Sequence, residues 1–196
     1  MSASHGDSGR PTVGLSRAAL EAHLHQVLEP GTGRDPVVSL ARLEEREIVI
    51  KDFASRSFLV RNLIGRWMIA REAKAYRALE GHPAVPRFYG CVDALALALE
   101  YRPGRRMSRR SYAALPAEFL GELEKAIREM HARGVAHLDL RHRTNVLADS
   151  AGHPVLIDFG SAICLRPGGL AARIFLPLLA YFDLRALRKW QLRMQA

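Results

Sequence analysis

The sequence predicts an α+β protein of two small lobes around a cleft, with an antiparallel sheet and a helix in the first lobe and a reduced, mainly helical second lobe. Apolar and β-branched runs of strand length occupy residues 37–52 and 88–101. A strongly amphipathic helical stretch, 115–133, separates them from two further short strands at 146–148 and 155–157. A chain of 196 residues that is 48% hydrophobic is long enough to bury such a core.

The first lobe is expected to span residues 16–101, after a flexible polar tail at 1–15. Residues 16–28 carry leucines at helical spacing and predict a helix, which Gly31 and Gly33 separate from the first strand. Residues 57–79 predict helical structure broken near Gly65, with buried faces that include Trp67 and Tyr76.

The second lobe is expected to span residues 102–196. The helix 115–133 places Leu120, Leu123, Ile127 and Met130 on one stripe, and Gly134 follows its end. The turn 149–152 joins the two short strands, and the last thirty or so residues look helical and basic.

The charge balance is basic, because 29 Lys and Arg against 20 Asp and Glu give a net charge of +9. Such a surface favours anionic partners, although a solubility effect explains it equally well. No nucleic-acid recognition motif accompanies the charge, so no nucleic-acid partner is expected. Cys91 and Cys164 are too few for a disulfide framework and are expected to fill core positions. With no secretory signal and no stretch of spanning length, the sequence predicts a cytoplasmic protein.

Three segments carry residue types that suit phosphoryl transfer. In chain order they are an apolar strand entering Lys51 with Glu72 on the next helix, His137-Leu-Asp139 followed by Asn145, and Ile157-Asp-Phe-Gly160. Together these motifs resemble the protein-kinase-like superfamily, more specifically the bacterial lipopolysaccharide kinases, which phosphorylate sugars of the lipopolysaccharide core, and more distantly the RIO-type kinases. The resemblance covers about residues 37–165 and implies a minimal bilobal protein-kinase-like fold that uses ATP and Mg²⁺.

The resemblance implies a role for each motif residue, and the chemistry of each residue suits that role. Asp139 is the expected catalytic base, which would orient an acceptor hydroxyl toward the γ-phosphate. Asn145 and Asp158 offer the oxygen ligands that Mg²⁺ prefers, and the hairpin between them brings both to one end of the cleft. Lys51 is expected to contact the α- and β-phosphates while Glu72 holds it in place.

The strand 95–101 resembles the one that leads into the kinase hinge. Backbone groups near Glu100 and Tyr101 are therefore expected to bind adenine, with Ala84, Val38 and Leu147 lining the same pocket.

Three features depart from the protein-kinase pattern. Asn145 follows Asp139 by six residues rather than five, in a loop where Arg141 and Arg143 would either steady phosphates or remain solvated. Residues 37–48 contain no glycine, so the turn 43–46 is not expected to form a phosphate cradle. No Ala-Pro-Glu segment follows Gly160, which leaves little room for a peptide-docking platform.

Three functional hypotheses stay open on this evidence. The first is ATP- and Mg²⁺-dependent phosphorylation of a sugar hydroxyl in lipopolysaccharide or a similar glycolipid, and the second is a serine/threonine protein kinase. The third is a nucleotide-binding pseudokinase or scaffold, which the missing glycine loop favours and the complete motif set opposes. The basic amphipathic tail, 170–196, either completes the second lobe or makes peripheral contact with an anionic inner membrane.

Overall fold

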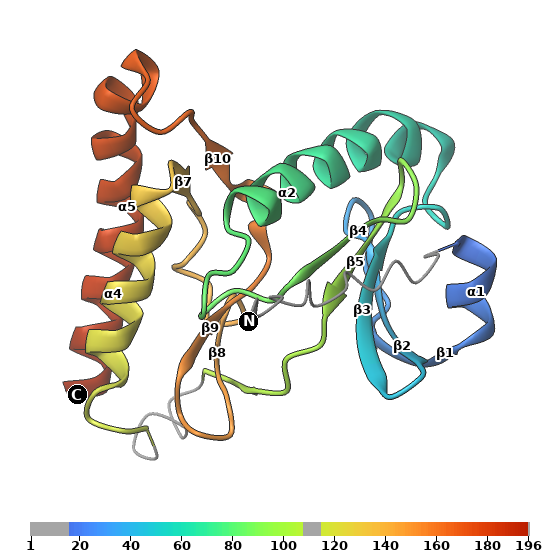
Figure 1. The fold of residues 1–196 in the computed structure, drawn as a ribbon, viewed down its shortest axis with the longest axis horizontal. Coiled ribbons are helices and arrows are strands. Elements are labelled where there is room, and N and C mark those ends of the chain that lie inside the picture. Colours follow the sequence, from blue (N-terminus) through green and yellow to red (C-terminus); the bar gives the residue numbers. More distant parts are fainter. Residues whose placement is uncertain (1–15, 108–114, 196) are drawn as a thin grey trace, which may run out of the picture.

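The computed structural model describes residues 16–107 and 115–195, and a five-stranded antiparallel sheet forms its first part (Figure 1). The sheet order is β1-β2-β3-β5-β4. Its strands are β1 (Leu24–Glu29), β2 (Val37–Leu43), β3 (Arg46–Asp52), β4 (Phe88–Cys91) and β5 (Ala96–Glu100). The β-branched runs of β2 and β3 pair along their whole length, as their strand propensity predicts. The predicted tail at 1–15 lies outside the described residues.

The two faces of the sheet bury different partners, because side chains alternate along each strand. Ile48 and Ile50 of β3 pack with Leu20 of α1 (Arg17–Ala22) in a small separate cluster. Leu97 and Leu99 of β5 belong to the main core, which also holds buried side chains of α2 (Arg66–Ala78). The sheet is therefore covered on both sides, with Val49 and Lys51 of β3 on the face turned to the main core.

The predicted helix at 16–28 is wrong in its second half. The helix ends at Ala22, and the chain continues as β1, which pairs antiparallel with β2. Leu20 is buried at 2% exposure, whereas Leu24 is 43% exposed, so the leucine spacing did not mark one buried helix face. Pairing with β2, which lies later in the chain, decides the strand.

A helical segment connects β3 to β4, as predicted, but it is not broken near Gly65, because Gly65 and Arg66 both keep right-handed helical backbone angles. The π-helical turn η1 (Val60–Gly65) leads directly into α2. A Cβ at Gly65 would lie 2.7 Å from the Cβ of Phe53, so the glycine permits this close approach of helix and loop. Tyr76 is buried as expected, but Trp67 is 58% exposed, so the prediction of a buried Trp67 is wrong.

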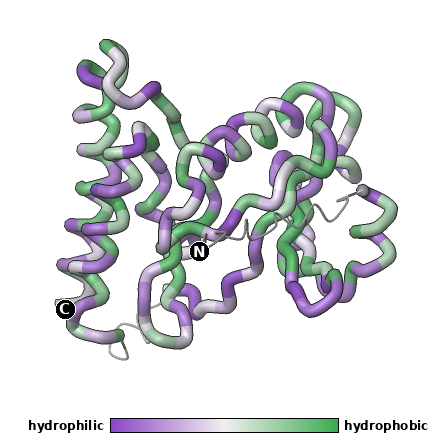
Figure 2. Tube along the Cα trace, in the orientation of Figure 1, coloured by the Kyte–Doolittle hydropathy of each residue, from purple (hydrophilic) through white to green (hydrophobic). Residues whose placement is uncertain are grey.

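Two long helices, α4 (Phe119–Ala132) and α5 (Leu170–Gln195), lie side by side in the second part of the chain (Figure 1). The stripe Leu123, Ile127 and Met130 of α4 is buried, although the helix begins four residues later than the pattern at 115–133 predicts. Figure 2 shows hydrophobic and hydrophilic residues alternating along α5. The buried residues of α5 include Leu187 and Trp190, so this helix completes the second lobe.

Short strands fill the space between these helices and the sheet. They are β6 (Arg105–Arg106), β8 (Val146–Ala148) and β9 (Pro154–Leu156) in one sheet, and β7 (Val135–Ala136) with β10 (Ile163–Cys164) in another. The 3-10 turn η2 (Phe159–Ser161) joins β9 to β10. One continuous core crosses both lobes, and the boundary at 101/102 stays a prediction.

The cysteine prediction is wrong for one residue and partly right for the other. Cys91 is exposed, and Cys164 is half-buried, with burial raising the pKa of its thiol. Among the residues that the structure describes, no helix has the length and apolar character needed to cross a membrane.

Candidate active site

The core-facing end of β3 holds the first part of the site. Lys51 Nζ donates to Glu72 Oε1 at 2.7 Å and to Asp158 Oδ1 at 2.8 Å. Burial alone would lower the pKa of Lys51, but the two carboxylates outweigh burial and hold that pKa well above its usual value. The positive charge of Lys51 in turn holds the pKa of Asp158 below its usual value. Sheet register and helix packing thus fix an ion-paired lysine beside an ionised carboxylate.

The loop between β7 and β8 holds the second part of the site. Asn145 Nδ2 donates to Asp139 Oδ2 at 3.0 Å and to the Asp139 carbonyl at 3.1 Å. Thr144 Oγ1 donates to Asn145 Oδ1 at 3.1 Å. His142 Nδ1 lies 2.6 Å from Asp139 Oδ1, and Arg141 Nε lies 3.7 Å from the same oxygen. The contact with His142 was not expected from the sequence, since it depends on how the loop folds back on itself.

The β8–β9 hairpin brings these two parts together. The N–H of Ile157 donates to the carbonyl of Asn145 at 3.0 Å, so Asn145, directly before β8, and Asp158, shortly after β9, lie at the same end of the hairpin. Asp158 reaches Lys51, and Asn145 reaches Asp139. The structure therefore brings together the four side chains that the sequence assigned to one triphosphate.

Two non-glycine residues of the site have left-handed backbone conformations. Leu138, in the His-Leu-Asp loop, has φ of 66°, and Asp158 has φ of 64°. Such conformations cost on the order of 1–3 kcal/mol each and persist only where surrounding contacts impose them. Their position beside Asp139 and Lys51 is typical of a functional site.

A column of aromatic rings links the two lobes behind the site. Phe88 of β4 stacks on Tyr76 of α2 with centroids 6.1 Å apart, and Tyr76 meets Phe159 edge-on at 5.1 Å. Phe159 then contacts His137 at 4.7 Å. Burial lowers the pKa of His137, and its Nε2 lies 3.0 Å from the carbonyl of Ile157. His137 thus supports the loop by packing and hydrogen bonding.

Sequence reasoning missed the anchor of this column, Asp183 of α5. The carboxylate of Asp183 is buried and accepts the N–H groups of His137 and Leu138, both at 2.8 Å. Trp190 of the same helix donates its Nε1–H to the carbonyl of Leu140 at 2.9 Å. Asp183 is the one acidic residue in the apolar and basic segment 170–196, and this isolation was the available signal.

The structure also corrects the position of the glycine loop. Gly31 and Gly33 lie between β1 and β2, at φ of 62° and 55°, rather than before the first strand. A Cβ at Gly31 would lie 2.2 Å from the carbonyl oxygen of Pro36, so only glycine fits there. Arg56 donates to the carbonyl of Pro30 and ties the loop to the β3–α2 connection. The prediction that the chain lacks a glycine-containing loop between its first strands is wrong.

Comparison with curated proteins finds protein kinases, whereas no protein-family model matches the chain. The chain is 34% identical over 104 residues to serine/threonine-protein kinase RIM15 of Saccharomyces cerevisiae, a match covering 48% of this chain and 6% of RIM15. It is 31% identical over 156 residues to calcium-dependent protein kinase 9 of Oryza sativa subsp. japonica, covering 71% and 26% of the two chains. It is 29% identical over 105 residues to mitogen-activated protein kinase kinase kinase 3 of Homo sapiens, covering 45% and 17%.

The chain is a distant homologue of protein kinases. It spans about a quarter or less of the length of these three relatives. The five-stranded sheet with its packed helix and the helical second lobe agree with a small bilobal kinase-like fold.

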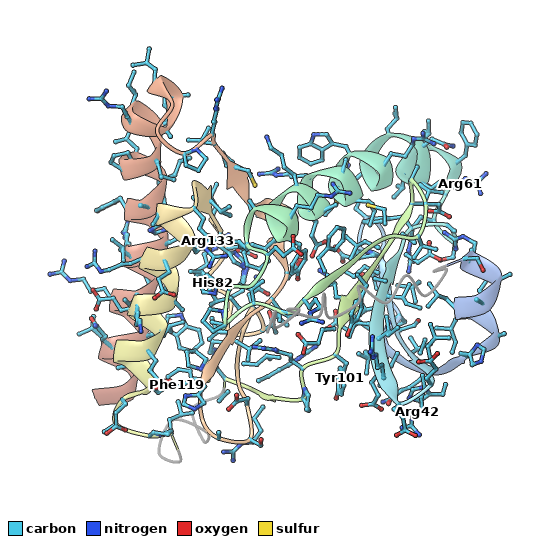
Figure 3. All side chains as sticks on the ribbon, viewed as in Figure 1. Arg42, Arg61, His82, Tyr101, Phe119 and Arg133 are labelled. Carbon is cyan, nitrogen blue, oxygen red and sulfur yellow. The ribbon has the colours of Figure 1, made fainter. Side chains whose placement is uncertain are left out.

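The segment predicted to form the hinge follows β5. The N–H of Glu100 donates to the carbonyl of Arg87 at 2.9 Å, and the N–H of Tyr101 donates to the carbonyl of Glu47 at 3.2 Å. Tyr101 lies between the two lobes (Figure 3). Because both N–H groups are engaged, the predicted adenine contact would fall to the carbonyl groups of Glu100 and Tyr101.

A cavity of about 630 Å³ lies beside the predicted hinge. Glu100, Tyr101 and Ala84 line it together with α4 and the β8–β9 turn, whereas Val38 and Leu147 do not. Val38 instead pairs with Lys51 across β2 and β3. Of the three residues predicted to share a pocket with Glu100 and Tyr101, Ala84 therefore lines this cavity, and Val38 and Leu147 do not.

The donor set of the kinase homologue suits Mg²⁺ bound together with a nucleotide. Asp158 offers a half-exposed carboxylate, and Asn145 offers an amide oxygen. Mg²⁺ in nucleotide sites is held by one or two protein oxygens with phosphates and water completing the shell. Over residues 16–107 and 115–195 no group of three or more His, Cys, Asp or Glu is placed to hold a metal ion.

Proposed function

We propose that this kinase homologue transfers the γ-phosphoryl group of ATP to a hydroxyl acceptor in the presence of Mg²⁺. The observation that carries the proposal is the convergence of Lys51, Asp139, Asn145 and Asp158 on one edge of the β8–β9 hairpin. A lysine, a base and two magnesium ligands at one place are what positioning and charge neutralisation of a triphosphate require.

Each residue has a role in this mechanism. Lys51, held by Glu72, binds the α- and β-phosphates, and Asn145 and Asp158 hold the metal ion. Bound Mg²⁺ supplies charge neutralisation on the phosphate oxygens. The loop with Gly31 and Gly33 covers the phosphates through backbone N–H groups, and hinge carbonyls of Glu100 and Tyr101 contact adenine.

Asp139 receives the proton of the acceptor hydroxyl. The acceptor oxygen forms a bond to the γ-phosphorus, the bond from that phosphorus to the β–γ bridging oxygen breaks, and ADP leaves. Oδ2 of Asp139 accepts from Asn145 and Oδ1 faces His142, so an entering hydroxyl competes with His142 for Oδ1. His142 thereby keeps the carboxylate oriented until the acceptor binds.

The acceptor we favour is a sugar hydroxyl of lipopolysaccharide or a similar glycolipid. Only the segment 161–169 joins Gly160 to α5, and α5 at once packs on α4 and holds the catalytic loop through Asp183. That segment is short for a platform that binds an extended peptide. Such an acceptor places the protein in the cytoplasm at the inner face of a membrane.

A serine/threonine acceptor in a protein is the second candidate. The names of the relatives favour it, because two of them are a serine/threonine-protein kinase and a calcium-dependent protein kinase. The pseudokinase alternative rested on the missing glycine loop. Because Gly31 and Gly33 lie between the first two strands, that argument no longer supports it.

An acceptor screen with labelled ATP tests the proposal. Purified protein is incubated with Mg²⁺ and either a lipopolysaccharide core glycolipid or a casein-like protein, and transferred label is counted. Asp139→Asn is expected to lower transfer at least 100-fold while ATP still binds. Asp158→Asn is expected to abolish the Mg²⁺-dependent thermal shift with ATP, and Asp93→Asn, on the exposed β4–β5 turn, is the matched control. Full transfer by Asp139→Asn would remove the base assignment, and ATP binding without transfer to either acceptor would indicate a pseudokinase.

A further inference from the structure

The helical segment before and at the start of α2 exposes four large apolar side chains. Phe58 and Leu59 are each 69% exposed, Leu63 is 68% exposed and Trp67 is 58% exposed. We call these four residues the α2 face. Leu59, Leu63 and Trp67 follow one another at intervals of four, so they lie along one side of the helix.

The α2 face lies opposite the side that holds the active-site glutamate. Ile69, Glu72 and Tyr76 are buried against the sheet and the aromatic column. The helix therefore already has its core-facing side, and the α2 face is a second apolar side. A contiguous exposed apolar surface of this kind is typical of an interaction site rather than of a solvent-facing helix.

The charge around the α2 face is almost entirely positive. Six basic residues lie in the segment 54–78, namely Arg56, Arg61, Arg66, Arg71, Lys74 and Arg77. The one acidic residue of that segment, Glu72, is buried on Lys51. Two of the arginines lie over aromatic rings of the face, Arg61 at 5.8 Å from the centroid of Phe58 and Arg71 at 4.8 Å from that of Trp67.

We infer that the α2 face docks on an anionic phospholipid bilayer. A tryptophan, a phenylalanine and leucines flanked by arginines match the apolar and charged layers of a bilayer interface. A second copy of the chain would bring equal positive charge against this face, so self-association is disfavoured. The inference concerns lipid binding alone and stands whether or not the proposed phosphotransfer is correct.

The first turns of α5 also expose apolar side chains. Leu170 is 73% exposed, and Ile174 and Phe175 are each 53% exposed. In Figure 1 this end of α5 and the junction of η1 and α2 both lie at the upper edge of the molecule. A bilayer along that edge contacts the two segments at once, while the β2–β3 turn with Arg42 lies at the opposite, lower side (Figure 3).

Sedimentation with vesicles tests the inference on the full chain without nucleotide. Phosphatidylcholine vesicles are compared with vesicles in which about a third of the lipid is phosphatidylglycerol. Arg61→Gln with Arg66→Gln is expected to weaken binding to the anionic vesicles roughly 30-fold, because each arginine near the surface contributes about 1 kcal/mol. Arg42→Gln with Arg46→Gln removes the same charge at the β2–β3 turn and is expected to change binding less than 2-fold.

Tryptophan fluorescence supplies a second, site-specific measurement. The chain has two tryptophans, and Trp190 is 1% exposed, so a blue shift on vesicle addition reports Trp67. Leu63→Ser is expected to reduce that shift and the vesicle affinity together, while urea unfolding stays unchanged because Leu63 is exposed.

Four results would overturn the inference. Two concern the lipid: no binding to anionic vesicles, or equal binding to neutral and anionic vesicles. The third is an equal loss of vesicle affinity in both arginine double variants. The fourth is that Leu63→Ser changes only the sedimentation of the protein without vesicles. The last result would assign the α2 face to contact between copies of the chain. The proposed phosphotransfer is measured separately with the acceptor screen, so the two can fail independently.

Discussion

Replacement of Lys51 by methionine is expected to destabilise the fold strongly at neutral pH and weakly at acidic pH. The side chains of Lys51 and Glu72 are 11% and 5% exposed, so the variant leaves a buried carboxyl group without its cation. Asp158 also loses its cation in the variant, but its side chain is 50% exposed, so water solvates the carboxylate. Burial already raises the pKa of Glu72 against the opposing effect of Lys51, so loss of the lysine raises that pKa further, and we expect Glu72 to take up a proton in the folded variant.

The magnitude follows from proton linkage. Keeping a glutamate protonated costs about 1.4 kcal/mol for each pH unit above its ordinary pKa of about 4.3, which gives about 3.7 kcal/mol at pH 7 and about 1 kcal/mol at pH 5. In the folded variant the pKa of Glu72 lies above the unfolded value. Its contribution to stability is therefore fully present below about pH 4.3 and is lost as the pH rises through the folded pKa. Urea unfolding of wild type and variant at pH 5 and pH 7 measures the difference.

Two further variants make the reasoning refutable. Adding Glu72→Gln to Lys51→Met removes the titrating group and is expected to recover most of the loss at pH 7. Lys125→Met, at a side chain 77% exposed, is the matched control and is expected to change stability by less than about 0.5 kcal/mol. A loss in Lys51→Met that is equal at both pH values, or a double variant as unstable as the single one, would refute the argument.

Three other variants test the parts of the site that the sequence did not reveal. Asp183→Ala removes the acceptor of two loop N–H groups and is expected to cost about 1–3 kcal/mol for each in urea unfolding; an unchanged midpoint would contradict this. Gly31→Ala places a Cβ 2.2 Å from a carbonyl oxygen and is expected to weaken ATP binding, measured by thermal shift, more than Gly33→Ala, whose Cβ meets no atom within 4 Å. Arg71→Leu removes two hydrogen bonds to the segment after the Asp-Phe-Gly motif and is expected to raise the Mg²⁺ concentration needed for ATP binding several-fold. Lys74→Leu loses one 3.3 Å bond to that segment, and an effect as large as that of Arg71→Leu would count against a specific role of Arg71.

Local patterns predicted those elements whose partners lie close in sequence. The strands β2 and β3 form a hairpin, and α4 buries the stripe that its spacing indicated. The strand β1 was not predicted, because Leu20, Leu24 and Leu28 have helical spacing and only the pairing of Leu24 with Ala41 reveals a strand. That one error also displaced Gly31 and Gly33 from the first turn of the sheet.

The site was predictable where its residues belong to short motifs. Lys51, Asp139, Asn145 and Asp158 each stand in a recognisable segment, and the structure brings them together. Asp183 belongs to no such segment, since its role depends on the packing of α5 beneath the loop. Long-range tertiary contacts of this kind leave no periodic trace in the sequence.

The bond from Trp190 to the carbonyl of Leu140 has a consequence for biosynthesis. Its two ends lie 50 residues apart in the chain. At about 5–20 residues per second, a ribosome needs about 2.5–10 s to pass from one to the other. During that interval the loop that contains Leu140 has been synthesised, but the part of α5 that fixes it has not. Nucleotide capture is therefore expected only after α5 has left the exit tunnel.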